Sequence, residues 1–233
     1  MQTTHPFFLA LLLAGSMGVT QAAPIIFSDS SYSTFALADA GSASDGPHSE
    51  LSMNLLPISS AANANSSGGD TASAVAFADT LFLTTTSEAR GGSGTAASTA
   101  ITTFTGMFDA LPGLLNFSIN FGAFIDTLAS GFASNYLAVT LEVGGVTLFD
   151  DVLFDTASIN QQFLLASGGA GLFDLTLISS ADATPGNYAF SLASVNATLD
   201  TAVVAVPEPA SAALLLAGLV GLGLTRRRTP QHA

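Results

Sequence analysis

The stretch that decides the fold reads Leu137-Ala138-Val139-Thr140-Leu141-Glu142-Val143-Gly144-Gly145-Val146-Thr147-Leu148-Phe149. Up to Val143, large apolar residues occupy every second position, which is typical of a strand with one buried and one solvent-facing side. The pair Gly144-Gly145 can adopt the positive φ angles that a two-residue turn between antiparallel strands requires. The stretch therefore predicts a β-hairpin over residues 137–149.

Residues 173–199 predict a second hairpin. Phe173, Leu175 and Leu177 again alternate with their neighbours. The segment Thr184-Pro185-Gly186-Asn187 has proline and glycine where a type II turn requires them. A return strand is expected from Tyr188 to about Leu199.

Earlier segments carry weaker patterns. Residues 75–83 alternate with a period of two and predict one strand, whereas the Ala, Asn, Ser and Gly content of residues 61–69 predicts a mobile surface loop. Residues 123–134 suit either a helical turn or a crossing strand. No segment repeats at a fixed period, so the short strands with Gly and Pro turns predict an all-β fold. We expect a single antiparallel, jelly-roll-like β-sandwich over residues 23–205.

The predicted sandwich is strongly acidic. Between residues 23 and 206 lie 16 of the 17 Asp and Glu residues, but only Arg90 of the four basic residues, which gives a formal charge of −15. This charge disfavours nucleic acid and anionic lipid as partners of the domain, and it favours solubility, divalent cations or basic partners.

The residue inventory removes most catalytic chemistry. The chain has no Cys and no Lys, and His48 is the one histidine outside the two terminal segments. Thiol nucleophiles, Schiff-base lysines and sites with several imidazoles are therefore excluded within one chain. A Ser-His-Asp site would need His48, which follows Gly46-Pro47 in an expected loop. We expect no enzyme, and no cofactor unless calcium binds.

Asp150, Asp151 and Asp155 are the densest carboxylates and the candidate calcium ligands, because hard cations bind clustered oxygen atoms. Asp150 and Asp151 point to opposite faces if the chain is extended there, and sit together if the hairpin has a bulge. The alternative to calcium is a solvated segment whose charges keep an edge strand from pairing with another chain.

Sugar stacking is the other candidate chemistry. The chain has no Trp, and Tyr32, Tyr136 and Tyr188 are its only tyrosines and the candidate platforms for a sugar ring. Most of the 17 Phe residues stand at apolar strand positions or near the N-terminus, where packing is the expected role.

Residues 1–22 predict a secretory signal peptide and therefore use of the Sec export machinery. Pro6 to Ala14 is apolar, and cleavage after Ala22 places Thr20 at the −3 position. The first five residues contain no Lys or Arg, which departs from the usual pattern. An uncleaved anchor is the alternative, although the apolar stretch is short for a membrane span.

Residues 206–233 combine three parts. Val206-Pro207-Glu208-Pro209 is expected to be extended, because proline cannot continue a helix. The uncharged residues 210–225 predict a short transmembrane helix; residues 210–224 reach about 22 Å, short of the ~30 Å hydrocarbon core, which indicates a transient anchor. Arg226, Arg227 and Arg228 act as a membrane stop, so residues 226–233 are expected to form a cytoplasmic tail, with the rest of the chain across the membrane.

This arrangement resembles the PEP-CTERM sorting signal of exported proteins in Gram-negative bacteria. The resemblance covers residues 206–228. It implies recognition and cleavage by a membrane protease called exosortase. Members share the tail rather than an activity, so the resemblance implies a route: an inner-membrane-anchored intermediate, followed by the cell surface or the extracellular matrix.

These features predict an exported envelope or extracellular-matrix protein with a structural or adhesive role in exopolysaccharide or biofilm. The expected partners are exosortase, the Sec machinery and exopolysaccharide. The alternative function is that of a carbohydrate- or calcium-binding β-sandwich module.

Overall fold

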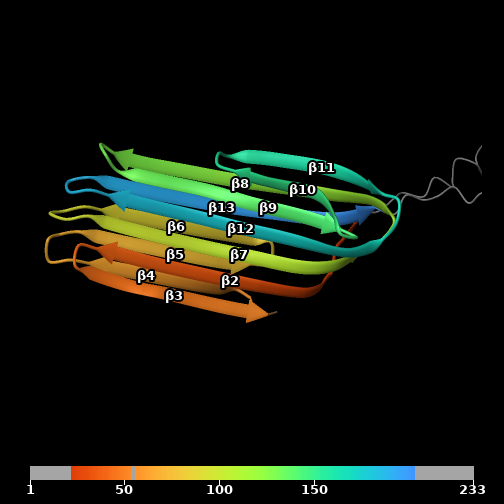
Figure 1. Ribbon diagram of the computed structural model, residues 1–233, viewed down its shortest axis with the longest axis horizontal. Coiled ribbons are helices and arrows are strands. Elements are labelled where there is room, and N and C mark those ends of the chain that lie inside the picture. The colour runs from red at the N-terminus through yellow and green to blue at the C-terminus, as the bar shows by residue number, and fades with distance from the viewer. Residues whose placement is uncertain (1–21, 54–55, 203–233) are drawn as a thin grey trace, which may run out of the picture. The chain divides into compact units, whose positions relative to one another are not determined.

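Residues 22–53 and 56–202, which the computed structural model describes, fold into antiparallel strands joined by turns (Figure 1). The expected signal peptide, apart from Ala22, and the whole sorting tail lie outside these residues. Within the described ranges, no helix is long and apolar enough to cross a membrane. The strands are β1 (Ala22–Pro24), β2 (Phe27–Ala40), β3 (Ala43–Met53), β4 (Ile58–Asn65), β5 (Thr71–Asp79), β6 (Phe82–Arg90), β7 (Ala96–Ala110), β8 (Gly113–Leu128), β9 (Phe132–Val143), β10 (Val146–Leu153), β11 (Ala157–Leu165), β12 (Gly169–Ala183) and β13 (Tyr188–Ala202).

The strands form two facing sheets, so the expected antiparallel β-sandwich is confirmed. One sheet has the order β11-β8-β13-β6-β5-β4, with β1 also paired to β13, and the other has the order β10-β9-β12-β7-β2-β3. The last two strands, β12 and β13, belong to different sheets: β12 lies between β7 and β9, and β13 lies between β6 and β8. This winding of strand pairs across two sheets is typical of a jelly roll. Strands β2 to β5 extend both sheets on one side.

Strands of both sheets run along nearly the same direction in Figure 1, as in aligned sandwiches. Strands β10 and β11 lie along one side of the view, and β3 and β4 along the opposite side. These four strands are the edges of the two sheets.

The hairpin predicted over residues 137–149 is confirmed. Strands β9 and β10 pair in antiparallel register on either side of Gly144 and Gly145, whose φ angles are +61° and +75°. Both glycines thus adopt the left-handed conformation that the two-residue turn requires. The register shifts by one residue between Thr147 and Phe149.

The second predicted hairpin is wrong. The turn at Thr184–Asn187 exists, with Gly186 at a φ of +77°, but β12 and β13 belong to opposite sheets. Strand β12 pairs with β7 and β9, whereas β13 pairs with β6 and β8. Local turn chemistry determines that the chain reverses, whereas the sheet that the return strand joins depends on partners distant in the sequence.

Three weaker expectations are also corrected or decided. The run 75–83 is not one strand, because Thr80, at a φ of +50°, and Leu81 form a turn between β5 and β6. Residues 61–65 belong to β4, and only residues 66–69 form a turn. For residues 123–134 the strand alternative holds, since β8 continues to Leu128 and β9 begins at Phe132.

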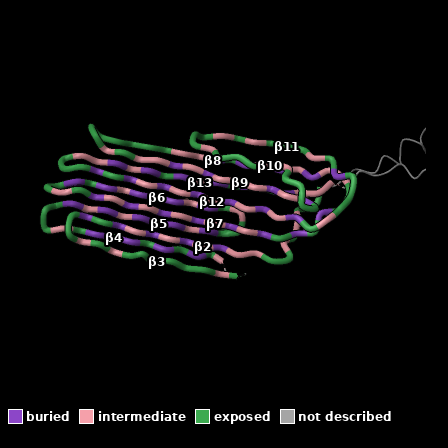
Figure 2. Tube along the Cα trace, viewed as in Figure 1, coloured by how far each residue is buried: buried purple, intermediate pink, exposed green. Residues whose placement is uncertain are grey.

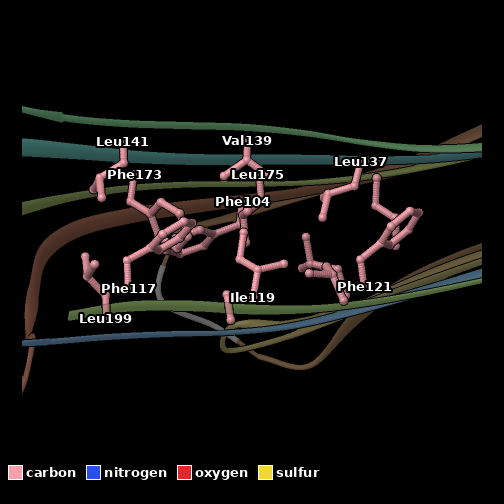
Figure 3. Packing of buried hydrophobic residues seen from close by; sticks show 14 of the residues in the cluster. Phe104, Phe117, Ile119, Phe121, Leu137, Val139, Leu141, Phe173, Leu175 and Leu199 are labelled. Atoms are coloured by element: carbon pink, nitrogen blue, oxygen red, sulfur yellow. The ribbon is translucent and has the colours of Figure 1, made fainter. Parts of the chain in front are cut away.

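A Phe- and Leu-rich core fills one part of the space between the sheets. In Figure 3, the side chains of Phe117, Ile119 and Phe121 point toward those of Phe173, Leu175 and Leu137 from the opposite layer. Phe173 is fully buried, and its ring lies 5.7 Å from that of Phe117 and 6.0 Å from that of Phe104 between ring centroids. Buried positions alternate with partly exposed ones along the strands, as Figure 2 shows.

The rest of the interior is lined by small residues, which we call the alanine cluster. Short hydroxyl side chains here reach the backbone of the opposite sheet: Ser87 Oγ donates to Ser179 O at 2.8 Å, and Ser98 Oγ donates to Glu88 O at 2.9 Å. Such bonds require the sheets to lie closer than the about 10 Å that larger side chains impose. The cluster consists of Ala36, Ala38, Ala40, Ala62, Ala64, Ala72, Ala74, Ala76, Ala89, Ala96, Ala100, Ala181, Ala183 and Ala189.

Candidate functional site

The outer face of β8, β11 and β13 carries a block of polar side chains, eight neutral and one acidic, that we call the polar grid. Burial alternates along β8 from Leu115 to Phe121, so Phe117 and Ile119 point into the core while their neighbours on β8 face the outer side. The grid consists of Asn116, Ser118 and Asn120 on β8, Ser158, Asn160 and Gln162 on β11, and Asn196, Thr198 and Asp200 on β13.

The strand register aligns these nine residues in three rows. Each residue of β8 stands between one residue of β11 and one of β13. Same-face residues are about 7 Å apart along a strand, and strands are about 4.8 Å apart, so the grid measures roughly 13 by 10 Å. The rows are Gln162–Asn116–Asp200, Asn160–Ser118–Thr198 and Ser158–Asn120–Asn196.

Two shallow hollows lie over the grid. One, of about 550 Å³, is lined by the first two rows, and the other, of about 400 Å³, by the third row. The second hollow also includes Phe82, Ser194 and Gly122. The side chain of Phe82 is 43% exposed, and Phe82 is the register partner of Asn196. The grid thus has an exposed aromatic ring at one corner.

Hydrogen bonds within the grid use few of its polar atoms. Ser158 Oγ donates to Asn120 Oδ1 at 2.9 Å, and Gln162 Nε2 donates to Asn116 Oδ1 at 3.0 Å. Each asparagine thus accepts one hydrogen bond with its amide oxygen and keeps its N–H donors available. The side chains of Asn160 and Asn196 have no hydrogen-bond partner among the residues that the structure describes.

The candidate calcium ligands do not converge. Asp150 and Asp151 are consecutive on extended β10, an edge strand, so their side chains point to opposite faces; Asp155 follows the strand. Asp150 Oδ1 accepts from Thr140 Oγ1 at 3.1 Å. The described residues contain no group of three or more His, Cys, Asp and Glu that could hold a metal ion. The placement suits the alternative interpretation, in which exposed charges protect an edge strand.

The three tyrosines lie in different environments. Tyr32 is buried beside Phe104, with 5.0 Å between ring centroids, where a sugar ring has no access; burial raises the pKa of its hydroxyl. Tyr136 is on the outer face of β9, 6.2 Å from the ring of Phe154. Tyr188 begins β13 in the other sheet, and burial, followed by nearby carboxylates, raises its pKa. They therefore do not form one platform.

His48 lies in a strand rather than the expected loop. Its Nε2 is 2.8 Å from Asp45 Oδ1, and both side chains are exposed on β3. Asp45 Oδ2 accepts from the backbone N–H of Asn63 at 2.7 Å, and Glu50 Oε2 accepts from that of Ser59 at 3.1 Å. These two carboxylates cap backbone donors on the free side of the edge strand β4. Donation by the Asn63 N–H, and then by His48, lowers the pKa of Asp45.

The buried carboxylate of Asp70 was not singled out by the sequence patterns. It accepts hydrogen bonds from Ser66 Oγ at 2.6 Å and from the backbone N–H groups of Gly92 and Gly94 at 2.8 and 2.7 Å. The Ser66 hydroxyl, and then the Gly94 N–H, lowers the pKa of Asp70. A Cβ atom at Gly94 would lie 2.8 Å from this carboxylate. Asp70 therefore joins the β4–β5 turn to the β6–β7 loop.

We expect Asp70→Asn to lower the melting temperature at pH 7 and to have a decreasing effect below about pH 4. A carboxylate whose pKa is lowered by folding stabilises the fold above the unfolded pKa of about 3.9, and this stabilisation is lost as the pH falls through the folded pKa. Thermal unfolding by circular dichroism between pH 7 and pH 2.5 measures the difference. Asp109→Asn, at an exposed position of β7, is the control. A constant difference across this range would contradict the role of the ionised carboxylate.

The grid was also missed by the sequence patterns, although one signal was present. Asn116, Ser118 and Asn120 alternate with apolar residues, but the other two strands lie 38 to 84 residues further along the chain. Only the register of β8 with β11 and β13 brings the three short polar runs together.

Comparison with curated proteins found no match. Among solved structures, the chain is similar to TmCBM61 in complex with β-1,4-galactotriose, with a TM-score of 0.23 and 10% sequence identity, over 51% of this chain and 81% of that chain. This likeness is too low to support an inference about ligands. A family model, the PEP-CTERM protein-sorting motif, matches residues 205–228. The C-terminal tail is therefore a PEP-CTERM protein-sorting motif, which implies export and processing by an exosortase in the membrane.

Proposed function

We propose that this chain is a structural or adhesive protein of the cell envelope or extracellular matrix, delivered there through its tail and retained in exopolysaccharide or biofilm. The observation that carries the proposal is the sorting motif at residues 205–228. In this proposal a signal peptide over residues 1–22 directs the chain to the Sec machinery. Residues 210–225 then hold it in the inner membrane as an intermediate, until exosortase acts.

An adhesive rather than an enzymatic role is supported by the residue types of the domain. Between residues 23 and 206 there is one histidine, His48, with no Cys and no Lys. His48 is exposed on β3 and is paired with Asp45. We therefore propose that the domain acts by binding and not by catalysis.

The test is deletion of the coding gene in the producing organism. Loss of the protein should weaken cohesion of the cell layer in its matrix, and the full-length gene should restore it. Antibody labelling of intact cells should detect the sandwich at the surface. Unchanged cohesion together with unlabelled cells would refute the proposal.

A second candidate function is that of a carbohydrate-binding module, which was the alternative expected from the sequence. The polar grid favours it, because this hollowed face is made of amides and hydroxyls with a single carboxylate, Asp200. Calcium binding gains no such support, since Asp150, Asp151 and Asp155 are not gathered.

A further inference from the structure

We propose that the polar grid binds a neutral polysaccharide chain and is the surface through which the protein adheres to exopolysaccharide. This inference rests on the proposed adhesive function and names the class of its ligand. With hollows of about 550 and 400 Å³ over a face of roughly 13 by 10 Å, the grid accommodates a short stretch of sugar units.

The residue types of the grid are unlike those of the surrounding surface. Asn is disfavoured in strands, whereas Thr satisfies both strand geometry and water. Outer-face positions on β6 and β7 use Thr, as at Thr84, Thr86 and Thr103. The two exposed amides of β4, Asn63 and Asn65, pair with Ser73 and Thr71 rather than with further amides. The grid instead has five amide side chains at adjacent strand positions. Strand stability does not account for them, and such local departures from propensity mark functional sites. The five are Asn116, Asn120, Asn160, Asn196 and Gln162.

The hydrogen-bonding capacity of the grid matches that of a polyol. Amides and hydroxyls each present donors and acceptors, as do the hydroxyl groups of a sugar. Within the grid, the side chains of Asn116 and Asn120 use only their amide oxygen, so their N–H groups stay available to a ligand. The side chains of Asn160 and Asn196 make no hydrogen bond with the described residues. A ligand hydroxyl can therefore bind without displacing an existing side-chain bond.

Charge selects a neutral ligand over an acidic one. Asp200 is the only charged member of the grid, and no Lys or Arg belongs to it. The domain from 23 to 206 carries a formal charge of −15. A chain of uronic acids or sulfated sugars would be repelled, whereas a neutral chain loses nothing.

Phe82 completes the site for a sugar ring. Its exposed ring is beside Asn196, and the apolar C–H face of a pyranose can pack on it. Gly122 is next to the third row on β8, and a Cβ atom there would lie 3.2 Å from Ser194 Oγ. The missing side chain keeps that hollow open.

The experiment uses the full-length protein, purified in detergent, and native electrophoresis in gels that contain polysaccharide. The probes are the neutral fraction of the producer's own exopolysaccharide, with alginate as a polyanionic comparator. The variant combines Asn116→Thr, Asn160→Thr and Asn196→Thr, which removes three amides while raising strand propensity, so that the fold is preserved. The matched control combines Asn63→Thr and Asn65→Thr, two exposed amides on β4 of the same sheet.

We expect the neutral fraction to retard the wild type and the control equally, and the triple variant at least about tenfold more weakly, since several hydrogen bonds are lost together. Phe82→Ala should also weaken retention. Equal retention of the triple variant, no retention of the wild type by the neutral fraction, or stronger retention by alginate would each overturn the proposal. If cells that carry the triple variant keep their cohesion while deletion abolishes it, the adhesive function stands and the grid is not its contact.

Discussion

Replacement of Pro207 and Pro209 by alanine should leave the full-length precursor in the membrane and remove its processed form from the cell surface. Each proline fixes its own φ near −65° and biases the preceding residue, Val206 or Glu208, toward extended geometry. A protease binds an extended segment, and alanine allows the helix expected for the apolar span to continue into the motif. We expect the processed fraction to fall at least about tenfold.

Immunoblots of membrane and extracellular fractions measure the ratio of precursor to processed protein. Pro230→Ala is the matched control, because Pro230 lies in the tail but outside the motif at residues 205–228. A second variant, with Arg226, Arg227 and Arg228 replaced by Gln, should remove the charges that stop the tail at the membrane, without changing how the protease recognises the motif. If the Pro207 and Pro209 variant is processed like the wild type, the tail is only an anchor.

The sorting motif could be found from the sequence because its information is local and linear. Val206 to Pro209, the apolar span and the three arginines are consecutive, and no distant residue completes them. The hairpin at Gly144-Gly145 was predictable for the same reason. Its two strands are adjacent in the sequence and pair with each other.

Features that depend on distant pairing were not predictable. The turn at Thr184–Asn187 looks like a hairpin locally, yet β12 and β13 do not pair with each other. Their partners lie 28 or more residues away in the sequence: β12 pairs with β7 and β9, and β13 pairs with β6 and β8. In the run 75–83, Val75 and Phe77 are the larger residues, but the structure buries Ala74, Ala76 and Ala78 instead. The close approach of the sheets leaves space only for the smaller side chains.

The polar grid is another feature that depends on pairing between strands distant in the sequence. Each of its three runs, seen alone, is a half-polar strand, and the site exists only where β8 lies between β11 and β13. The same close packing of sheets also places a second group of polar residues inside the sandwich. That group centres on Asn135, which is 2% exposed on β9.

Replacement of Asn135 by alanine should be the most destabilising polar substitution in the described domain. Asn135 Nδ2 donates to the carbonyl oxygens of Phe124 and Leu192, each at 3.0 Å, across the two sheets. Its Oδ1 accepts from Ser179 Oγ at 2.7 Å and also from Ser191 Oγ. No buried side-chain polar atom of the described residues lacks a partner in this arrangement.

The expected loss of stability in Asn135→Ala comes from the two carbonyl groups to which Asn135 donates. The two hydroxyls have other acceptors, since Ser179 also contacts Thr85 and Ser191 donates to Ser134 O. The carbonyls of Phe124 and Leu192 lose the donor from Asn135, at about 1–3 kcal/mol for each buried group. The free energy of unfolding should therefore fall by roughly 2–6 kcal/mol, with a drop in melting temperature of about 4–24 °C for a domain of this size.

Asn135→Asp separates hydrogen bonding from volume, because it is isosteric and keeps both acceptor contacts. Its second oxygen faces two carbonyls, and burial raises the pKa of such a carboxyl, so the deficit relative to wild type should grow as the pH rises above about 4. Urea unfolding of both variants at pH 5 and pH 7.5 measures this, with exposed Asn63→Ala as the control. If Asn135→Ala unfolds within about 0.5 kcal/mol of the wild type, the size of a change at an ordinary surface position, the amide does not hold the two sheets together and the sandwich depends on its apolar contacts alone.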